Sequence, residues 1–174
     1  MSVEVSSVPL PSATVDAAPS TAAIGGHPIH PMLVPLPIGM LTSAAISDLV
    51  AVNGGGTFWS RASRWLLRGG LATGAMAGVF GAIDFLTIEQ ARRPEGWIHA
   101  GGNATVLGLT AANLAIRGDD DHVPFVGALL TVATAMLLLL TGWMGGELSY
   151  RHRVGVAERR QGEFVGSNEE IVPV

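Results

Sequence analysis

The feature that most constrains this chain is a series of four long segments that are almost free of charged residues. They are residues 35–52, 62–88, 97–116 and 123–144. At a rise of 1.5 Å per residue, each covers about 27–40 Å, which is about the thickness of the apolar core of a bilayer. The apolar residues form continuous runs rather than alternating, which favours helices over strands. The sequence therefore predicts an all-α integral membrane protein.

Composition supports this interpretation and excludes other classes. Only 14% of the 174 residues are charged, against about 25% in a typical soluble domain. The net charge is -4, so no overall basic field would attract nucleic acid. Cysteine is absent, which removes disulfides, thiolate metal ligands and iron–sulfur ligation. Any metal or haem would have to be held by histidines and carboxylates.

Short connections between the four segments predict an up-down-up-down helical bundle. Residues 1–25 are rich in Ser, Pro, Ala and Val and lack the basic start of a secretory signal, so we expect a disordered tail. Residues 26–155 form the four-span transmembrane domain, and residues 156–174 form a polar tail. The expected helix of the first segment begins at Pro35, with the preceding histidines on an extended or kinked lead-in.

An even number of spans places both termini on one side of the membrane. That side receives six arginines and the opposite side receives four. The positive-inside rule then favours cytoplasmic termini, in a bacterial plasma membrane.

The same topology brings several ionisable residues to the end of the bundle where the termini lie. Because ionisable groups in apolar segments are costly, they usually have a function. Asp84 closes the second segment and His99 opens the third, so we expect Asp84 to accept a hydrogen bond from His99. The candidate metal ligands at this end are His27, His30, Asp84, His99 and Glu147.

Two spacings suggest further organisation. His30 precedes Asp84 by 54 residues and His99 precedes Glu147 by 48 residues, which suggests two related helical hairpins. Separately, Gly70, Gly74 and Gly78 recur every four residues, a spacing that lets helix backbones pack closely.

Several blocks of sequence resemble one known family. They are GHPIHP at 26–31, PLPIG at 35–39 followed by Asp48, Asp84 at the end of the second segment, HAGGN at 99–103 and GWMGGELSYRHRVGV at 142–156. Together they resemble a bacterial family of small four-helix membrane proteins, domain of unknown function 2231, over about residues 25–156. The resemblance implies a plan similar to four-helix b-type cytochromes. Members sometimes carry a Rieske-type iron–sulfur domain, which implies redox work by analogy, although this chain lacks the cysteines for such a domain.

Three functions remain open from the sequence. In the first, His30 and His99 are the axial ligands of haem b and Asn103 lines the pocket. In the second, the five candidate ligands hold a divalent transition metal in an oxidoreductase or transporter. In the third, the chain is a membrane anchor or partner subunit without a cofactor. The expected partners are the lipid bilayer and a redox or membrane protein, and no nucleic acid.

Overall fold

The computed structural model describes residues 17–156, and most of these residues are helical. The long helices are α2 (Pro35–Val50), α3 (Thr57–Thr87), α4 (Pro94–Arg117) and α5 (Phe125–Gly146). Shorter elements are the strands β1 (Ala23–Ile24) and β2 (His27–Pro28), the helix α1 (Ile29–Leu33), the π-helical turns η1 (Ala51–Gly55) and η3 (Glu147–Arg151), and the 3-10 turn η2 (Glu89–Arg92).

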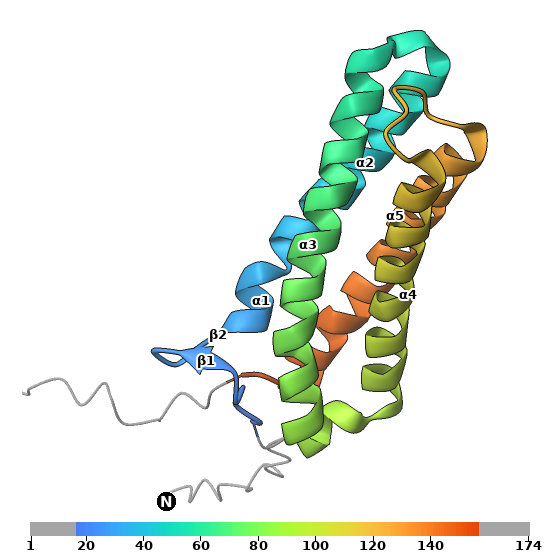
Figure 1. Cartoon of the computed structure of the whole chain (residues 1–174). Helices are drawn as coiled ribbons and strands as arrows, with labels where there is room; N and C mark the ends of the chain where they lie inside the picture. Colours follow the sequence, from blue (N-terminus) through green and yellow to red (C-terminus); the bar gives the residue numbers. More distant parts are fainter. Residues whose placement is uncertain (1–16, 157–174) are drawn as a thin grey trace, which may run out of the picture.

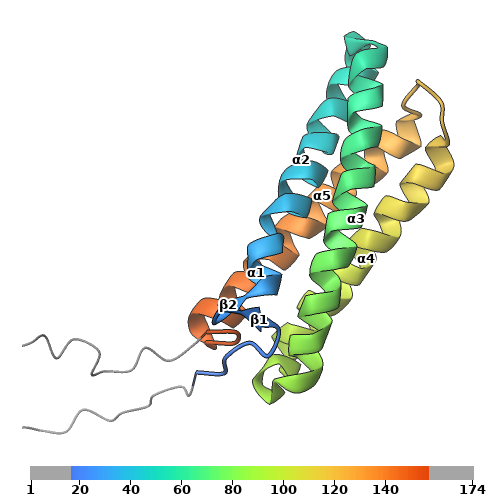
Figure 2. The ribbon, with the colours of Figure 1, turned by 60° about the vertical axis from the view of Figure 1, so that its left-hand side comes forward.

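The long helices form the predicted up-down-up-down bundle (Figure 1). Within it α2 packs against α3, α4 against α5, α2 against α5 and α3 against α4. Consequently α2 and α4 are diagonal to each other. The β1–β2 hairpin lies at one end of the bundle, and the α2–α3 connection lies at the other (Figures 1 and 2).

Local chemistry explains where the helices begin and turn. Pro35 and Pro94 stand at the first positions of α2 and α4, where proline has no hydrogen bond to lose and its fixed φ suits the helix. The tight α2–α3 connection uses Gly54 at φ 94° and Gly56 at φ 79°, a conformation that glycine adopts without steric cost.

All four long helices contribute to the central core. Its fully buried apolar side chains are Leu41, Ala44, Leu67, Val106 and Leu138. The glycine row of α3 packs inside the bundle, because a Cβ at Gly70 would meet Leu41 and one at Gly74 would meet Leu107. The predicted spacing therefore serves contacts within one chain.

Three continuous helical segments are long and apolar enough to cross a membrane. They are Ile29–Gly55, Thr57–Thr87 and Phe125–Arg151. The fourth helix, α4, has 24 residues but a lower apolar content, and it packs between α3 and α5. The chain is therefore an integral membrane bundle, and three of its four long helices are apolar enough to span the membrane by themselves.

The structure corrects two expected boundaries. Helix α3 begins at Thr57, five residues before the apolar segment starts, and so includes Arg61 in addition to Arg64 and Arg68. Part of the expected N-terminal tail is ordered against the bundle: Ala18 is buried and pairs with Val154, and Ala22 is buried as well. Residues 1–16 and 157–174 lie outside the described part of the chain.

Candidate functional site

Two histidines from diagonal parts of the bundle meet near the end where residue 17 lies. His30 comes from α1 and His99 from the second turn of α4. Their ring centroids are 6.3 Å apart and their planes are nearly perpendicular, at 88°. We call these two residues the histidine pair. Both side chains are half-buried.

One ring nitrogen of His30 is fixed by the backbone of α3. Nδ1 of His30 donates to the carbonyl oxygen of Ala77 at 2.8 Å. Gly81, one helical turn further along α3, leaves room for the ring, because a Cβ there would lie 2.8 Å from Nδ1. With its proton on Nδ1, a neutral His30 has a lone pair on Nε2.

His99 is held in the same way by α5. Its Nδ1 donates to the carbonyl oxygen of Thr141 at 2.8 Å, and a Cβ at Gly145 would lie 2.9 Å from Cε1 of the ring. Asn103 lies beside His99, as its position four residues later predicts. The amide nitrogen of Asn103 lies 2.9 Å from the His99 carbonyl oxygen and 3.3 Å from each ring nitrogen, so its best bond is to the carbonyl.

The two halves of the bundle therefore use one pattern of contacts. The His30 ring binds the carbonyl of Ala77 in α3, and the His99 ring binds the carbonyl of Thr141 in α5. In each half the glycine that admits the ring comes four residues later, at Gly81 and Gly145. These contacts support two related helical hairpins, as the sequence suggested. The feature that the hairpins share is a histidine with a facing glycine, rather than a histidine with a carboxylate at the end of the second helix.

The expected hydrogen bond from His99 to Asp84 is wrong. The Asp84 carboxylate instead accepts bonds from residues of the N-terminal segment that we had expected to be disordered. The donors are the Ser20 hydroxyl, the Thr21 backbone N–H and hydroxyl, and the Ala22 backbone N–H. The signal that could have indicated this is the Ser20-Thr21 pair, since such residues commonly present donors to a carboxylate.

The remaining candidate ligands lie at the same end but bind other partners. His27 is exposed and its Nδ1 contacts the Gly25 carbonyl at 3.0 Å. Glu147 pairs with Arg151 at 3.4 Å, four residues along the same turn. Within residues 17–156, no three histidines or carboxylates come together as a group that could hold a metal ion. Of the five candidate ligands, only the histidine pair is brought close together.

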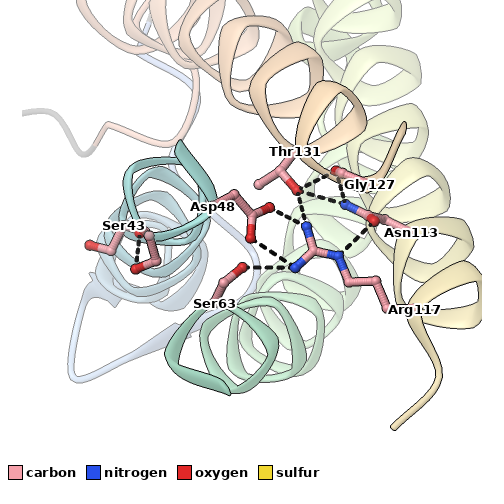
Figure 3. Close-up of polar contacts among 8 residues, drawn as sticks. Ser43, Asp48, Ser63, Asn113, Arg117, Gly127 and Thr131 are labelled. Atoms are coloured by element: carbon pink, nitrogen blue, oxygen red, sulfur yellow. Dashed lines mark hydrogen bonds and ion pairs between the residues drawn. The ribbon is translucent and has the colours of Figure 1, made fainter. Parts of the chain in front are cut away.

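A second polar cluster lies near the opposite end of the bundle, where sequence reasoning proposed no site (Figure 3). Arg117 of α4 forms an ion pair with Asp48 of α2 through both of its terminal nitrogens. The two side chains are only 2% and 0% exposed. Further partners of Arg117 come from the other helices: Ser63 of α3, Asn113 of α4 and Thr131 of α5. We call these five residues the arginine cluster.

Every N–H of the Arg117 guanidinium has an acceptor in this cluster. A guanidinium has five N–H groups, and five hydrogen bonds connect it to Asp48 (two), Ser63, Asn113 and Thr131. Thr131 also accepts from Asn113 and donates to the Gly127 carbonyl. The signal in the sequence was the single carboxylate, Asp48, inside the first apolar segment.

A third set of charges lies at this end of the bundle, where arginines of α3 meet aspartates of the loop between α4 and α5. Arg61 and Arg64 both bind Asp121, and Arg68 binds Asp119 at 2.9 Å. The hydrogen bond from Arg61, assisted by Arg64, lowers the pKa of Asp121 from 3.8 to about 2. These pairs connect the first turns of α3 to the loop.

The bundle with its histidine pair defines a small helical membrane protein. The chain belongs to the family described as "Predicted membrane protein (DUF2231)", which it matches over residues 26–158. The family suggested by the sequence motifs is thereby confirmed. No curated protein and no solved structure gives a match to the chain.

Proposed function

We propose that this membrane protein binds haem b between His30 and His99 and transfers electrons within the bilayer. The observation that carries the proposal is the spacing of the histidine pair, with ring centroids 6.3 Å apart. A metal–imidazole bond is about 2.0–2.1 Å and the ring centroid lies roughly 1 Å beyond the nitrogen, so two imidazoles on opposite sides of one metal have centroids roughly 6 Å apart.

The way the rings are held supports the same proposal. Metal-bound histidines almost always donate their other N–H to a carbonyl, carboxylate or water, which fixes the ring and raises its basicity. Both rings meet this requirement through their bonds to Ala77 and Thr141. These bonds support Nε2 as the metal-binding nitrogen of each ring, and at His99 the Asn103 amide nitrogen, 3.3 Å from Nε2, would have to move aside.

The number of protein ligands favours haem over a bare ion. A structural or catalytic zinc site needs three or four protein ligands, and the described residues bring only two imidazoles together. A porphyrin supplies the remaining four nitrogens itself, so a haem centre needs only axial ligands from the protein. When bound, the haem supplies a one-electron redox couple.

The position of the histidine pair along the bundle would decide near which face of the membrane the haem exchanges electrons. The histidine pair lies at the end of the bundle where residue 17 lies, which we propose to be cytoplasmic and to face a redox partner protein. Phe85 and Trp97 stack edge to face at 4.7 Å beside this end. Trp97 and Trp143 are both exposed, as tryptophans at a membrane–water interface often are.

The direct test is the absorption spectrum of the full chain in detergent, purified after expression with added haem precursor. We expect one haem per chain, with the reduced-minus-oxidised spectrum of bis-histidine coordination. His30→Ala and His99→Ala should each abolish that spectrum. His152→Ala, in the polar segment that follows η3, is the matched control and should leave the spectrum unchanged.

Two results would overturn the proposal. One is a folded wild-type protein that takes up no haem, which would leave the metal site and the membrane anchor or partner subunit as the two remaining functions. The other is stoichiometric haem that both histidine variants retain unchanged. Metal analysis of the same samples distinguishes a bound transition-metal ion from haem.

A further inference from the structure

We infer that Asp84 is a positioning residue that fixes the N-terminal segment on α3 and thereby sets the place of His30. The inference deepens the proposed function, because it names what holds one of the two haem ligands. It begins from the three residues whose donors converge on one carboxylate at the end of α3.

The contacts of Asp84 join two parts of the chain that are more than 60 residues apart. Oδ1 accepts from the backbone N–H of Thr21 at 2.9 Å and of Ala22 at 3.1 Å, and the Ser20 hydroxyl lies 2.7 Å from Oδ2. Hydrogen bonds to an ionised carboxylate are about twice as strong as neutral ones. Asp84 therefore accepts most of the hydrogen bonds that attach residues 20–22 to α3, and a contact of 2.6 Å between the hydroxyls of Thr21 and Thr87 adds one more.

From this attachment, backbone contacts lead directly to His30. The carbonyl of Ala22 accepts from the N–H of Ile29 at 2.9 Å, and β1 pairs with β2 between them. Ile29 is the first residue of α1 and precedes His30. Helix α1 has only five residues and continues through Val34 into α2, so α2 holds His30 from the C-terminal side and the attachment of residues 20–22 holds it from the N-terminal side.

One face of α3 receives the whole segment. Ala77, Gly81 and Asp84 are spaced by four and three residues, which places them on one side of the helix. Ala77 accepts from the His30 ring, Gly81 admits that ring, and Asp84 binds the residues upstream of it. The last turns of α3 therefore act as a template for residues 20–30.

The two histidines differ in how much they need such help. His99 lies within the 24-residue helix α4. It contacts Asn103 of the same helix and Thr141 of α5, which also bind each other. His30 has a single side-chain bond, to the backbone of Ala77. Removing the Asp84 carboxylate should therefore displace His30 and leave His99 in place.

The test uses two measurements on the full chain in detergent. The chain has no cysteine, so spin labels at Met32→Cys in α1 and Leu86→Cys in α3, both exposed positions, report the placement of α1 without any cofactor. We expect a narrow distance distribution that is lost in Asp84→Ala and only partly broadened in Asp84→Asn. Asn keeps an oxygen that accepts from the backbone of 21 and 22.

Glu89→Ala, an exposed acidic residue five positions later, is the matched control and should keep the narrow distribution. The second measurement is the haem spectrum, in which Asp84→Ala should show loss of one axial histidine while His99 retains the haem. Unchanged label distances in Asp84→Ala would overturn the inference whatever the haem does. A wild-type chain without haem would overturn the proposed function alone, because the label distances still decide the role of Asp84.

Discussion

The arginine cluster and the histidine pair are two polar sites in one bundle that satisfy their hydrogen bonds differently. They lie toward opposite ends of α4, since His99 and Arg117 are 18 residues apart, or about 27 Å along a helix. Around Arg117 all five N–H groups have acceptors within the protein. In the histidine pair, the backbone satisfies one nitrogen of each ring.

This difference separates a structural role from a functional one. A buried charge is tolerated when its partners are complete, and a complete set of partners leaves no group to bind a ligand. The arginine cluster joins α2, α3, α4 and α5 and so fixes how they pack. In the histidine pair the backbone binds only Nδ1 of each ring, and the Asn103 amide is the one side chain near Nε2 of His99 among the described residues, which is why we propose the function there.

The largest expected effect comes from breaking the ion pair of the arginine cluster. Arg117→Ala leaves Asp48 buried without its counter-charge, and removing one partner of a buried pair costs about 3–5 kcal/mol. We expect a large drop in the thermal unfolding temperature in detergent, or failure to accumulate in the membrane. Arg61→Ala, which removes a mostly exposed arginine, is the control and should change the unfolding temperature far less, because exposed ion pairs contribute little to stability.

A double variant tests whether the cluster is only structural. In Asp48→Leu with Arg117→Met, both charges are replaced by apolar side chains, and such replacements are often neutral or stabilising. We expect the double variant to recover most of the stability lost in Arg117→Ala and to keep the wild-type haem spectrum. If the double variant folds but loses the haem spectrum, the arginine cluster also serves the function. The division between a structural cluster and a functional histidine pair would then be wrong.

The next effect concerns the glycines beside the histidine pair. In Gly81→Ala and Gly145→Ala the new methyl group meets a histidine ring at 2.8 and 2.9 Å, so the ring must move from its carbonyl. Overpacking of this kind costs about 1–3 kcal/mol. Gly142→Ala in α5, where a Cβ meets nothing within 4 Å, should instead stabilise by about 0.5–1 kcal/mol.

The measurement is the thermal unfolding temperature of the three glycine variants, with the haem spectrum beside it. Opposite signs for Gly145→Ala and Gly142→Ala, which are three residues apart in one helix, would attribute the effect to the histidine ring. Equal stabilisation by both would mean that the rings are not confined as the structure describes.

The sequence predicted the bundle and its topology because long apolar segments and short connections leave few alternatives. It also predicted that His30 and His99 lie at one end, since the number of helices between them decides the side. The extra turns of α3 were missed because residues 57–61 are polar or aromatic at the edge of the apolar run. Hydropathy finds the apolar part of a helix. The helix itself extends beyond that part for as long as its backbone hydrogen bonds continue.

Partners were harder to predict than positions. Asp84 was assigned to His99 because both lie at the same end, but Ser20 and Thr21 present more donors to it. Arg117 follows the apolar segment 97–116 directly and ends its helix, so no partner inside the bundle was expected for it, although its long side chain reaches back to Asp48. Spacing along a helix places a residue on a face and at a depth, and the choice among several polar groups there depends on tertiary packing.

The smallest expected effect concerns the exposed arginine–aspartate pairs, which share their end of the bundle with the arginine cluster. Because the pKa of Asp121 is lowered from 3.8 to about 2 in the folded protein, its contribution to stability is present above about pH 4 and is lost as the pH falls toward about 2. We therefore expect the unfolding temperature of wild type to exceed that of Asp121→Asn at about pH 6 and the difference to vanish near about pH 2. At about 1 M salt the Debye length is near 3 Å, so salt should also reduce this difference. A difference that persists at low pH and in high salt would show that Asp121 acts through packing of the loop rather than through its charge.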